Sequence, residues 1–467
     1  MPSADLVLPT RMSRVAVVGA RARTRDVLVE LARAGRVELV GSLPPAEGEE
    51  VEAVRRLERA DGLPDAPPAL LPAAPDVAAL ERAGRRDLLA GEVELDRRAR
   101  LAVDHGSFSA WVGWAPTAAL PQLEERLGLV GAVVVELPRP AWVEPPTLFH
   151  PVSLERPFRA LVQVYGTARY RDIDPTLFTA VSFVAMFGMM FGDVGHGLVL
   201  ALLALWLRGR RRGRFAGFRP LWAIPFAAGL AGACFGLLYG EAFGPTGLVP
   251  RLWLDPLDRP VPLLLVALAA GAGLLVVSYV FGIVNRWRES GLAVALLDQS
   301  GVAGLTLFVG AAILGGGRYW HVLAVEIVGG ALAGIGLALL GLGLVLQAGG
   351  GAAAATQAGI ELVDAVIRLA SNLISFTRLA AFGLMHAALG AVMFDAARAL
   401  WGGVGGDVAA VVVFVLGNLV AFSLELLVTG VQALRLEYYE LFSRVFSGEG
   451  HAFAPWNLPV CSLEEGS

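Results

Sequence analysis

The pattern of apolar and polar positions divides the chain into two parts. Up to about residue 146, short apolar runs alternate with polar stretches, as in a soluble α+β domain. The pattern predicts a strand, a helix and a strand, and then the same three elements again. The predicted segments are 14–19, 22–34, 37–40, 108–114, 118–127 and 131–137.

Charged segments between these two β-α-β halves predict additional helices. Residues 47–59 and 77–101 flank a Pro-rich stretch and are expected to pack as a short antiparallel helical pair. The turn after the first strand contains a single glycine, Gly19, so a dinucleotide-binding fingerprint is not supported. We therefore expect residues 1–146 to form a structural α+β domain, with residues 147–175 linking it to the second part of the chain.

This second part is dominated by long apolar stretches. A helix needs about 20 apolar residues to span the hydrocarbon of a membrane. Residues 176–447 are therefore expected to form an all-α membrane domain, followed by a tail at 448–467. The apolar stretches are 176–191, 194–208, 218–240, 261–284, 296–316, 322–346, 358–400 and 407–446.

The placement of arginine predicts the topology of these stretches. The most positive loop, residues 208–219, should face the cytoplasm. If the N-terminal domain is also cytoplasmic, two crossings must precede this loop, and the four glycines within 187–197 allow the chain to reverse there. Eight spans result, with both termini cytoplasmic and a second positive loop at 285–289 on the same side. The last two spans are too long to stand upright, so we expect them to be long and tilted.

Composition supports this division and narrows the chemistry. The first 175 residues contain 47 charged positions, whereas residues 176–447 contain 30. All 38 basic residues are arginine, which excludes a P-loop and Schiff-base lysine chemistry. The two cysteines and six scattered histidines show no metal spacing, and a net charge of −4 gives no sign of nucleic-acid binding. We expect no cofactor, and the first thirty residues lack the apolar core of a secretory signal.

A polar stripe along the seventh span contains a deeply placed arginine. Asp364, Ser371, Ser375 and Arg378 follow one another at steps of 7, 4 and 3, which places them on one helix face. An arginine at the centre of a span costs at least about 2.5–3.5 kcal/mol and cannot lose its proton. Arg378 therefore needs an anion, which could belong to another protein. The alternative for the Ser and Thr positions is hydrogen bonding that holds the helices together.

The eighth span also has one polar face. Asn418, Glu425 and Gln432 recur at heptad steps, and Arg435 follows three residues later. A structural ion pair between Glu425 and Arg435 is one interpretation, and a role in transport is the other. If polar grooves reach Arg378 from opposite sides, they would form two half-channels. The cytoplasmic side would then use Asp364 and Glu361, and the outer side would use Glu425 and His386.

Several short motifs resemble those of one protein family. They occur in order along the chain, and the resemblance covers nearly the whole of it from residue 113 to residue 455. The family is that of the membrane stator subunit of rotary V-type and A/V-type ATPases, called subunit a or subunit I. Its N-terminal domain usually contains a long antiparallel coiled coil, where this chain has only the short predicted helical pair. The motifs are Glu144-Pro-Pro-Thr147, Ile173-Asp-Pro-Thr176, residues 187–197, Ser375-Phe-Thr-Arg-Leu-Ala380 with His386, Leu434-Arg-Leu-Glu437 and Phe446-Ser-Gly-Glu-Gly450.

The resemblance implies a function and a set of partners. It implies a non-catalytic, ion-conducting subunit of a bacterial or archaeal plasma membrane, coupling proton or Na⁺ movement to ATP hydrolysis or synthesis. Arg378 would face a rotor-ring carboxylate with Arg435 as its companion. The implied partners are a proteolipid ring, peripheral-stalk subunits, a central-stalk or ring-adaptor subunit and, indirectly, the soluble headpiece. An autonomous proton-coupled carrier and a purely structural membrane scaffold are the competing hypotheses. The family positions around the ion path are Arg378, Arg435, Glu425, His386, Gln432, Asp364 and, on the cytoplasmic side, Glu361.

Overall fold

The chain folds into two units, which are described separately. In the computed structural model, the described residues are 8–41, 67–140, 142–149, 156–210, 213–348, 352–402, 405–446 and 448–461, with Val54 and Leu57. The α/β unit consists of Pro9–His150 and Gly450–Ser467. The helical unit consists of Met1–Leu8 and Pro151–Glu449.

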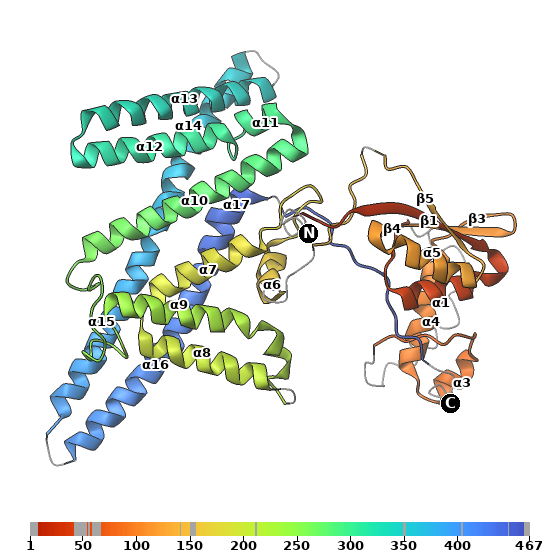
Figure 1. Cartoon of the computed structure of the whole chain (residues 1–467), viewed down its shortest axis with the longest axis horizontal. Helices are drawn as coiled ribbons and strands as arrows, with labels where there is room; N and C mark the ends of the chain where they lie inside the picture. The colour runs from red at the N-terminus through yellow and green to blue at the C-terminus, as the bar shows by residue number, and fades with distance from the viewer. Residues whose placement is uncertain are drawn as a thin grey trace. The chain divides into compact units, whose positions relative to one another are not determined.

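An antiparallel sheet is the centre of the α/β unit (Figure 1). The strand order is β2-β4-β1-β5, and β3 pairs with the outer part of β4. Because β4 is inserted between β1 and β2, the two predicted β-α-β halves interlock as split units. The short strand β3, which turns into β4 at Gly106, was not predicted. The strands are β1 (Met12–Ala20), β2 (Glu38–Leu39), β3 (Val103–His105), β4 (Phe108–Pro116) and β5 (Val133–Glu136).

Helices cover one face of this sheet. Val15, Val17 and Trp111 of the strands are packed in one core with Leu28 of α1 and Leu123 of α5. The segment predicted as one helix at 77–101 is two helices, since Gly84 takes a left-handed conformation between them. The other predicted member of the pair, 47–59, lies outside the described residues apart from Val54 and Leu57. The helical segments are η2 (Arg21–Arg23), α1 (Thr24–Ala34), α3 (Val77–Arg82), α4 (Arg86–Ala99), η3 (Thr117–Ala119) and α5 (Leu120–Leu129).

The C-terminal segment of the chain is part of the same unit. It forms parallel bridges from Ala452 to Thr147 and from Val460 to Leu70. Trp456 is buried in the core of the unit, and its backbone N–H donates to the Val37 carbonyl at 2.9 Å. The described C-terminal residues therefore fold together with the N-terminal strands and helices in one unit.

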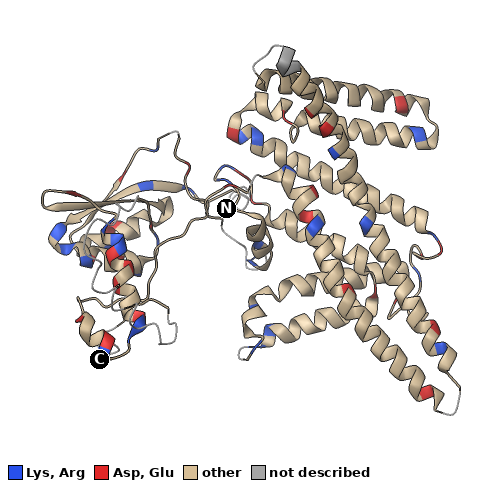
Figure 2. Cartoon of the chain, turned by 180° about the vertical axis from the view of Figure 1, so that it is seen from behind, with Lys and Arg blue, Asp and Glu red and all other residues tan. Residues whose placement is uncertain are grey.

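The helical unit contains long apolar helices with few charges among them (Figure 2). Within the described part of the chain, five stretches are long and apolar enough to cross a membrane: Pro260–Ser290, Leu292–Trp320, Leu323–Gln347, Thr356–Leu400 and Gly406–Val445. Three further apolar helices, α7, α8 and α9, have 16, 16 and 17 residues. The elements are α6 (Arg156–Tyr165), α7 (Thr176–Phe191), α8 (Val194–Gly209), η4 (Ala216–Leu221), α9 (Ala223–Tyr239), α10 (Pro260–Ser290), α11 (Leu292–Leu297), α12 (Val302–Trp320), α13 (Leu323–Gln347), α14 (Ala352–Ser375), α15 (Thr377–Leu400), α16 (Gly406–Leu436), the π-helical η5 (Glu437–Phe442) and α17 (Ser443–Val445).

One predicted loop is wrong. Residues 285–289 belong to the last turns of α10, which continues to Ser290. Polar side chains at this helix end have partners within the chain. Asn285 donates to the Val445 carbonyl at 2.9 Å, and Arg286 pairs with Asp298 at 3.5 Å. In the other predicted positive loop, Arg211 and Arg212 lie outside the described residues.

The predicted seventh span is interrupted at Phe376, so it is two helices, α14 and α15. Figure 1 shows α14, α15 and α16 running obliquely past the other helices of this unit. The Phe376 side chain is fully buried and packs against Gly271 of α10, where a β-carbon would lie 2.2 Å from the phenylalanine ring. Only glycine leaves room for the ring, so this contact positions the interruption.

Candidate functional site

Arg378 lies in the first turn of α15, two residues after the interruption. Its side chain is 27% exposed, and its Nη1 is 3.7 Å from Oε1 of the buried Glu440. That distance is an ion pair rather than a hydrogen bond, and Nη1 is a buried nitrogen without a hydrogen-bond partner. Arg378 therefore retains an unused donor beside a carboxylate.

Glu440 is held in this position by a π-helical turn at the end of α16. Such turns are rare, shift the register of a helix and occur frequently at functional sites. Here the turn places both Glu437 and Glu440 in the interior. Glu437 is fully buried, and its carboxylate accepts a hydrogen bond from Ser182 Oγ of α7 at 2.7 Å. Two buried acids thus lie within one turn of each other, and one of them, Glu440, is beside Arg378.

A second buried arginine follows the π-helical turn. Arg444 donates from Nη1 to the Tyr279 hydroxyl at 2.6 Å, and its guanidinium carbon is 4.6 Å from the centre of the Tyr279 ring. With the Asn372 amide assigned by its hydrogen-bond network, its oxygen accepts from Arg444 Nη2 at 2.9 Å. Among the described residues, Arg444 forms no ion pair with an acid, so only neutral groups accept from it, and its buried Nε has no hydrogen-bond partner.

A separate group of buried ionisable residues surrounds His386 of α15. We call this group, Asp193, His196, Glu241, His386 and Glu425, the His–acid cluster. None of its members is more than 6% exposed. They come from the turn between α7 and α8, from α8, from the segment after α9, and from α15 and α16. Four stretches of the sequence thus meet at this cluster.

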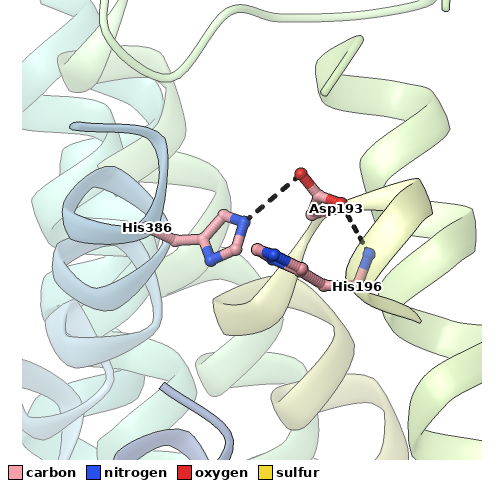
Figure 3. A group of neighbouring side chains, drawn as sticks. All are labelled: Asp193, His196 and His386. Carbon is pink, nitrogen blue, oxygen red and sulfur yellow. Dashed lines mark hydrogen bonds and ion pairs between the residues drawn. The ribbon is translucent and has the colours of Figure 1, made fainter. Parts of the chain in front are cut away.

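Hydrogen bonds define the geometry of the cluster. His386 Nδ1 is hydrogen-bonded to the Glu425 carboxylate. On the other edge of the ring, Nε2 is 3.7 Å from Asp193 Oδ2 and 4.0 Å from Glu241 Oε2. Asp193 also caps α8, accepting from the His196 N–H at 2.8 Å and from the Gly244 N–H at 3.0 Å. The capping bonds fix the Asp193 carboxylate beside His386 (Figure 3).

An aromatic shell encloses the two imidazoles. The His196 ring centre is 5.6 Å from that of His386. Phe191, Phe243 and Phe422 lie within 5.4–6.1 Å of the His196 ring centre. This shell limits the access of water and strengthens electrostatic interactions inside the cluster.

The remaining predicted residues lie apart from both sites or at their margins. Asp364 is exposed and pairs with Arg368 one turn along α14, at 2.6 Å, rather than with Arg378. Glu361 accepts from Gln357 at 2.9 Å. In α16, Gln432 has a buried Oε1 without a partner, and Arg435 is exposed. The considered Glu425–Arg435 pair does not form, because Glu425 bonds to His386 instead.

Sequence reasoning missed several residues of these sites. Asp193 and His196 were treated only as parts of a glycine-rich turn, although an acid between two apolar helices is a signal for a buried role. Glu241 follows an apolar helix in the same way. The sequence gives no sign of a π-helical turn near residue 440. It therefore indicates only charges at a helix end for Glu437, Glu440 and Arg444.

The fold and the sites are those of an integral membrane protein in which charged groups lie beside a pair of long helices. Residues 103–213 match the model of the V-type ATPase 116kDa subunit family. Subunit I of the A-type ATP synthase from Pyrococcus abyssi is 29% identical over 367 residues, covering 74% of this chain and 53% of that protein. The same subunit from Aeropyrum pernix is 30% identical over 370 residues, covering 68% and 52%.

A plant protein matches a shorter region. V-type proton ATPase subunit a1 of Arabidopsis thaliana is 37% identical over 108 residues, which is 21% of this chain and 13% of that protein. The chain belongs to the family of V-type ATPase subunit a and A-type ATP synthase subunit I. It spans about half the length of the curated subunit I relatives it matches.

Proposed function

We propose that this chain is the non-catalytic, ion-conducting stator subunit of a rotary V/A-type ATPase. It would couple the movement of protons or Na⁺ to ATP hydrolysis or synthesis by other subunits. The observation that carries the proposal is Arg378: a permanent cation at a helix interruption, with a buried Nη1 that has no hydrogen-bond partner and a carboxylate 3.7 Å away. A purely structural arginine would use its donors within the chain.

The chemistry follows from the charge of Arg378. A rotor-ring carboxylate that arrives beside it is stabilised in its ionised form and releases its proton or Na⁺. On moving away into hydrocarbon, the carboxylate must bind an ion again, because a bare anion there is too costly. Glu440 would act as the resting counter-ion of Arg378 between visits. The fixed positive charge would also block direct leakage between the two sides.

Two half-channels would supply ions to the two sides of Arg378. We assign the outer one to His386 and Glu425, which are buried together about 12 Å along α15 from Arg378. We assign the cytoplasmic one to Asp364 and Glu361 of α14, which are exposed and partly exposed, respectively. Gln432 and Arg435 of α16 would line the space between α15 and α16.

The proposed partners follow from the surfaces of the two units. The long helices of the helical unit expose many large apolar side chains, which a ring of proteolipid subunits and membrane lipid would cover. We propose that the α/β unit binds peripheral-stalk subunits and lies near the ring adaptor, with the soluble headpiece joined indirectly. The exposed apolar residues include Ile360, Val363, Ile367 and Ile374 of α14, Val392 of α15, and Val411, Leu419, Leu427 and Val431 of α16.

The number of crossings must be even. The two ends of the helical unit both continue into the α/β unit, which cannot lie on two sides of a membrane. The five long apolar stretches alone are an odd number. Adding the three shorter helices α7, α8 and α9 makes eight. We therefore propose eight spans, with the α/β unit and both termini in the cytoplasm.

Replacing Arg378 tests the function. In the assembled complex reconstituted in vesicles, Arg378→Gln should abolish ATP-driven ion pumping while the complex still assembles. Arg398→Gln is the matched control, because Arg398 is an exposed arginine near the other end of α15. Normal coupling in the Arg378→Gln complex would refute the proposal. Solute uptake by the purified chain alone would instead favour an autonomous carrier.

A further inference from the structure

The His–acid cluster contains three residues arranged like metal ligands. Asp193, His196 and His386 each offer a ligand atom, and these atoms lie within 4.8 Å of one another. Figure 3 shows the imidazole of His196 reaching from α8 towards that of His386, with the Asp193 carboxylate beside them. All three residues are buried, and they come from different elements.

His386 is oriented as metal-binding histidines usually are. Its Nδ1 is hydrogen-bonded to Glu425, so its Nε2 faces Asp193 and Glu241. A carboxylate on the far nitrogen fixes the tautomer and raises the basicity of the nitrogen that binds the metal. This arrangement is already complete in the folded chain.

Unpartnered buried atoms point to a missing ligand. Both ring nitrogens of His196 lack a hydrogen-bond partner, as does Glu241 Oε2. The residues are 4% and 6% exposed. Most buried polar atoms in proteins are satisfied, so two neighbouring exceptions facing one cluster require an explanation.

The charge of the cluster also favours a cation. It contains three carboxylates and two imidazoles. Among the described residues, no arginine forms an ion pair with Asp193, Glu241 or Glu425. Buried carboxylates must be protonated, paired or metal-bound, because an isolated buried anion is costly.

We propose that Asp193, His196 and His386 bind a divalent transition-metal ion, with Glu241 as a further ligand. Two imidazoles and carboxylate oxygens suit Zn²⁺, which is commonly four-coordinate. Mg²⁺ and Ca²⁺ prefer six or more oxygen ligands and fit poorly. A mostly apolar pocket lined by Phe243, Phe414 and Asn418 reaches His196.

The site stands independently of the proposed function, but its consequence for transport rests on that function. If His386 and Glu425 belong to the outer half-channel, bound Zn²⁺ would occupy the ion path and inhibit pumping. Binding and inhibition are separate measurements. Normal pumping by the Arg378→Gln complex would refute the transport role and leave the metal site intact.

Binding is tested on the purified full chain with Cys234→Ala and Cys461→Ser, which removes the thiols as competing ligands. Co²⁺ serves as the probe, because its visible absorption reports coordination by nitrogen and oxygen. We expect one Co²⁺ per chain, displaced by Zn²⁺ but not by Mg²⁺. Asp193→Asn keeps the helix cap but loses the charged ligand, and should weaken binding at least about tenfold.

Two other variants sharpen the test. Glu425→Gln should weaken Co²⁺ binding about 10- to 100-fold, as losses of outer-shell partners do. His321→Asn, at an exposed histidine, should bind like the parent. Absence of the Co²⁺ band in the parent, equal binding by Asp193→Asn, or equally good displacement by Mg²⁺ would overturn the metal site. Undiminished ATP-driven pumping at saturating Zn²⁺ would overturn the proposed block.

Discussion

At the scale of single residues, His386 is the common contact of three buried carboxylates. Glu425 is hydrogen-bonded to its Nδ1, and Asp193 and Glu241 lie within 4.0 Å of its Nε2. All three carboxylates therefore share one imidazole as their ion-pair partner, and Asp193 also accepts from two backbone N–H groups. This dependence predicts an unusually large effect of a single substitution.

His386→Ala should destabilise the chain by about 3–5 kcal/mol, because it leaves buried charges without a partner. Denaturant unfolding of the purified chain in detergent, followed by tryptophan fluorescence, measures this. His321→Asn is the control: His321 is exposed and has a φ of 57°, which asparagine tolerates, so a change within about 0.5 kcal/mol is expected. Equal stability of His386→Ala and the parent would contradict the described cluster.

The stability of the chain should depend on pH through Asp172. This residue lies in the segment between α6 and α7, outside the proposed membrane spans. Burial, together with the neighbouring Glu289 carboxyl, raises the pKa of Asp172 from 3.8 to about 7. Between these values the folded chain holds a proton that the unfolded chain has released. The free energy of unfolding should therefore fall as pH rises from about 4 to 7, and then stay level.

Asp172→Asn tests this effect, because asparagine has a similar shape and does not ionise. The loss of stability from about pH 4 to 7 should be smaller in this variant than in the parent, when thermal unfolding is measured across that range. Asp364→Asn, at an exposed acid, should keep the parental pH profile. An unchanged profile in Asp172→Asn would show that Asp172 is ionised in the folded chain.

At the scale of elements, the interruption between α14 and α15 depends on α10. The ring of Phe376 occupies the space that the missing side chain of Gly271 leaves open. Arg378 is two residues away, so the position of its guanidinium depends on this contact. The sequence of α10 thus influences the geometry of a site to which it contributes no charged group.

Gly271→Ala should displace Phe376, because the added β-carbon would lie 2.2 Å from Cγ of the ring. We expect a loss of about 1–3 kcal/mol, as in other overpacked cores, and reduced ATP-driven pumping by the assembled complex. Gly273→Ala is the matched control on the same helix, since its β-carbon would meet nothing within 4 Å. If the two variants pumped identically, the function of Arg378 would not depend on the contact between Phe376 and Gly271.

At the scale of the whole molecule, the shared α/β unit constrains the topology. With eight spans, the segment between α9 and α10 lies on the opposite side of the membrane from the α/β unit. If α7, α8 and α9 did not cross, that segment would lie on the same side. One exposed position in each region distinguishes these arrangements.

Leu248→Cys and Ser107→Cys, each without the native cysteines, provide the two positions. Leu248 is 76% exposed and lies between α9 and α10, and Ser107 lies exposed between β3 and β4. An impermeant maleimide applied to oriented vesicles should label them from opposite sides. Permeabilised vesicles, in which both should react, are the control. Labelling of both from the same side would exclude eight spans.

The sequence by itself determined the local elements. The apolar stretches at 176–191 and 194–208 agree with α7 and α8 to within one residue, because hydrophobic runs and glycine turns are local signals. Both predicted β-α-β halves were found for the same reason. The separation of Arg378 from other charged residues along the chain can also be counted from the sequence, and its depth in the membrane stays a prediction.

Only the tertiary structure decided which groups meet. Helical spacing predicts the face on which a residue lies, but not the residue that lies opposite. Glu425 was therefore compared with Arg435 on its own helix, whereas its partner is His386 of α15. Likewise, β4 lies between β1 and β2 because strand order depends on packing across the whole sheet. Asp193 belongs to the cluster because the turn between two apolar helices packs beside α15, and the sequence does not predict this contact.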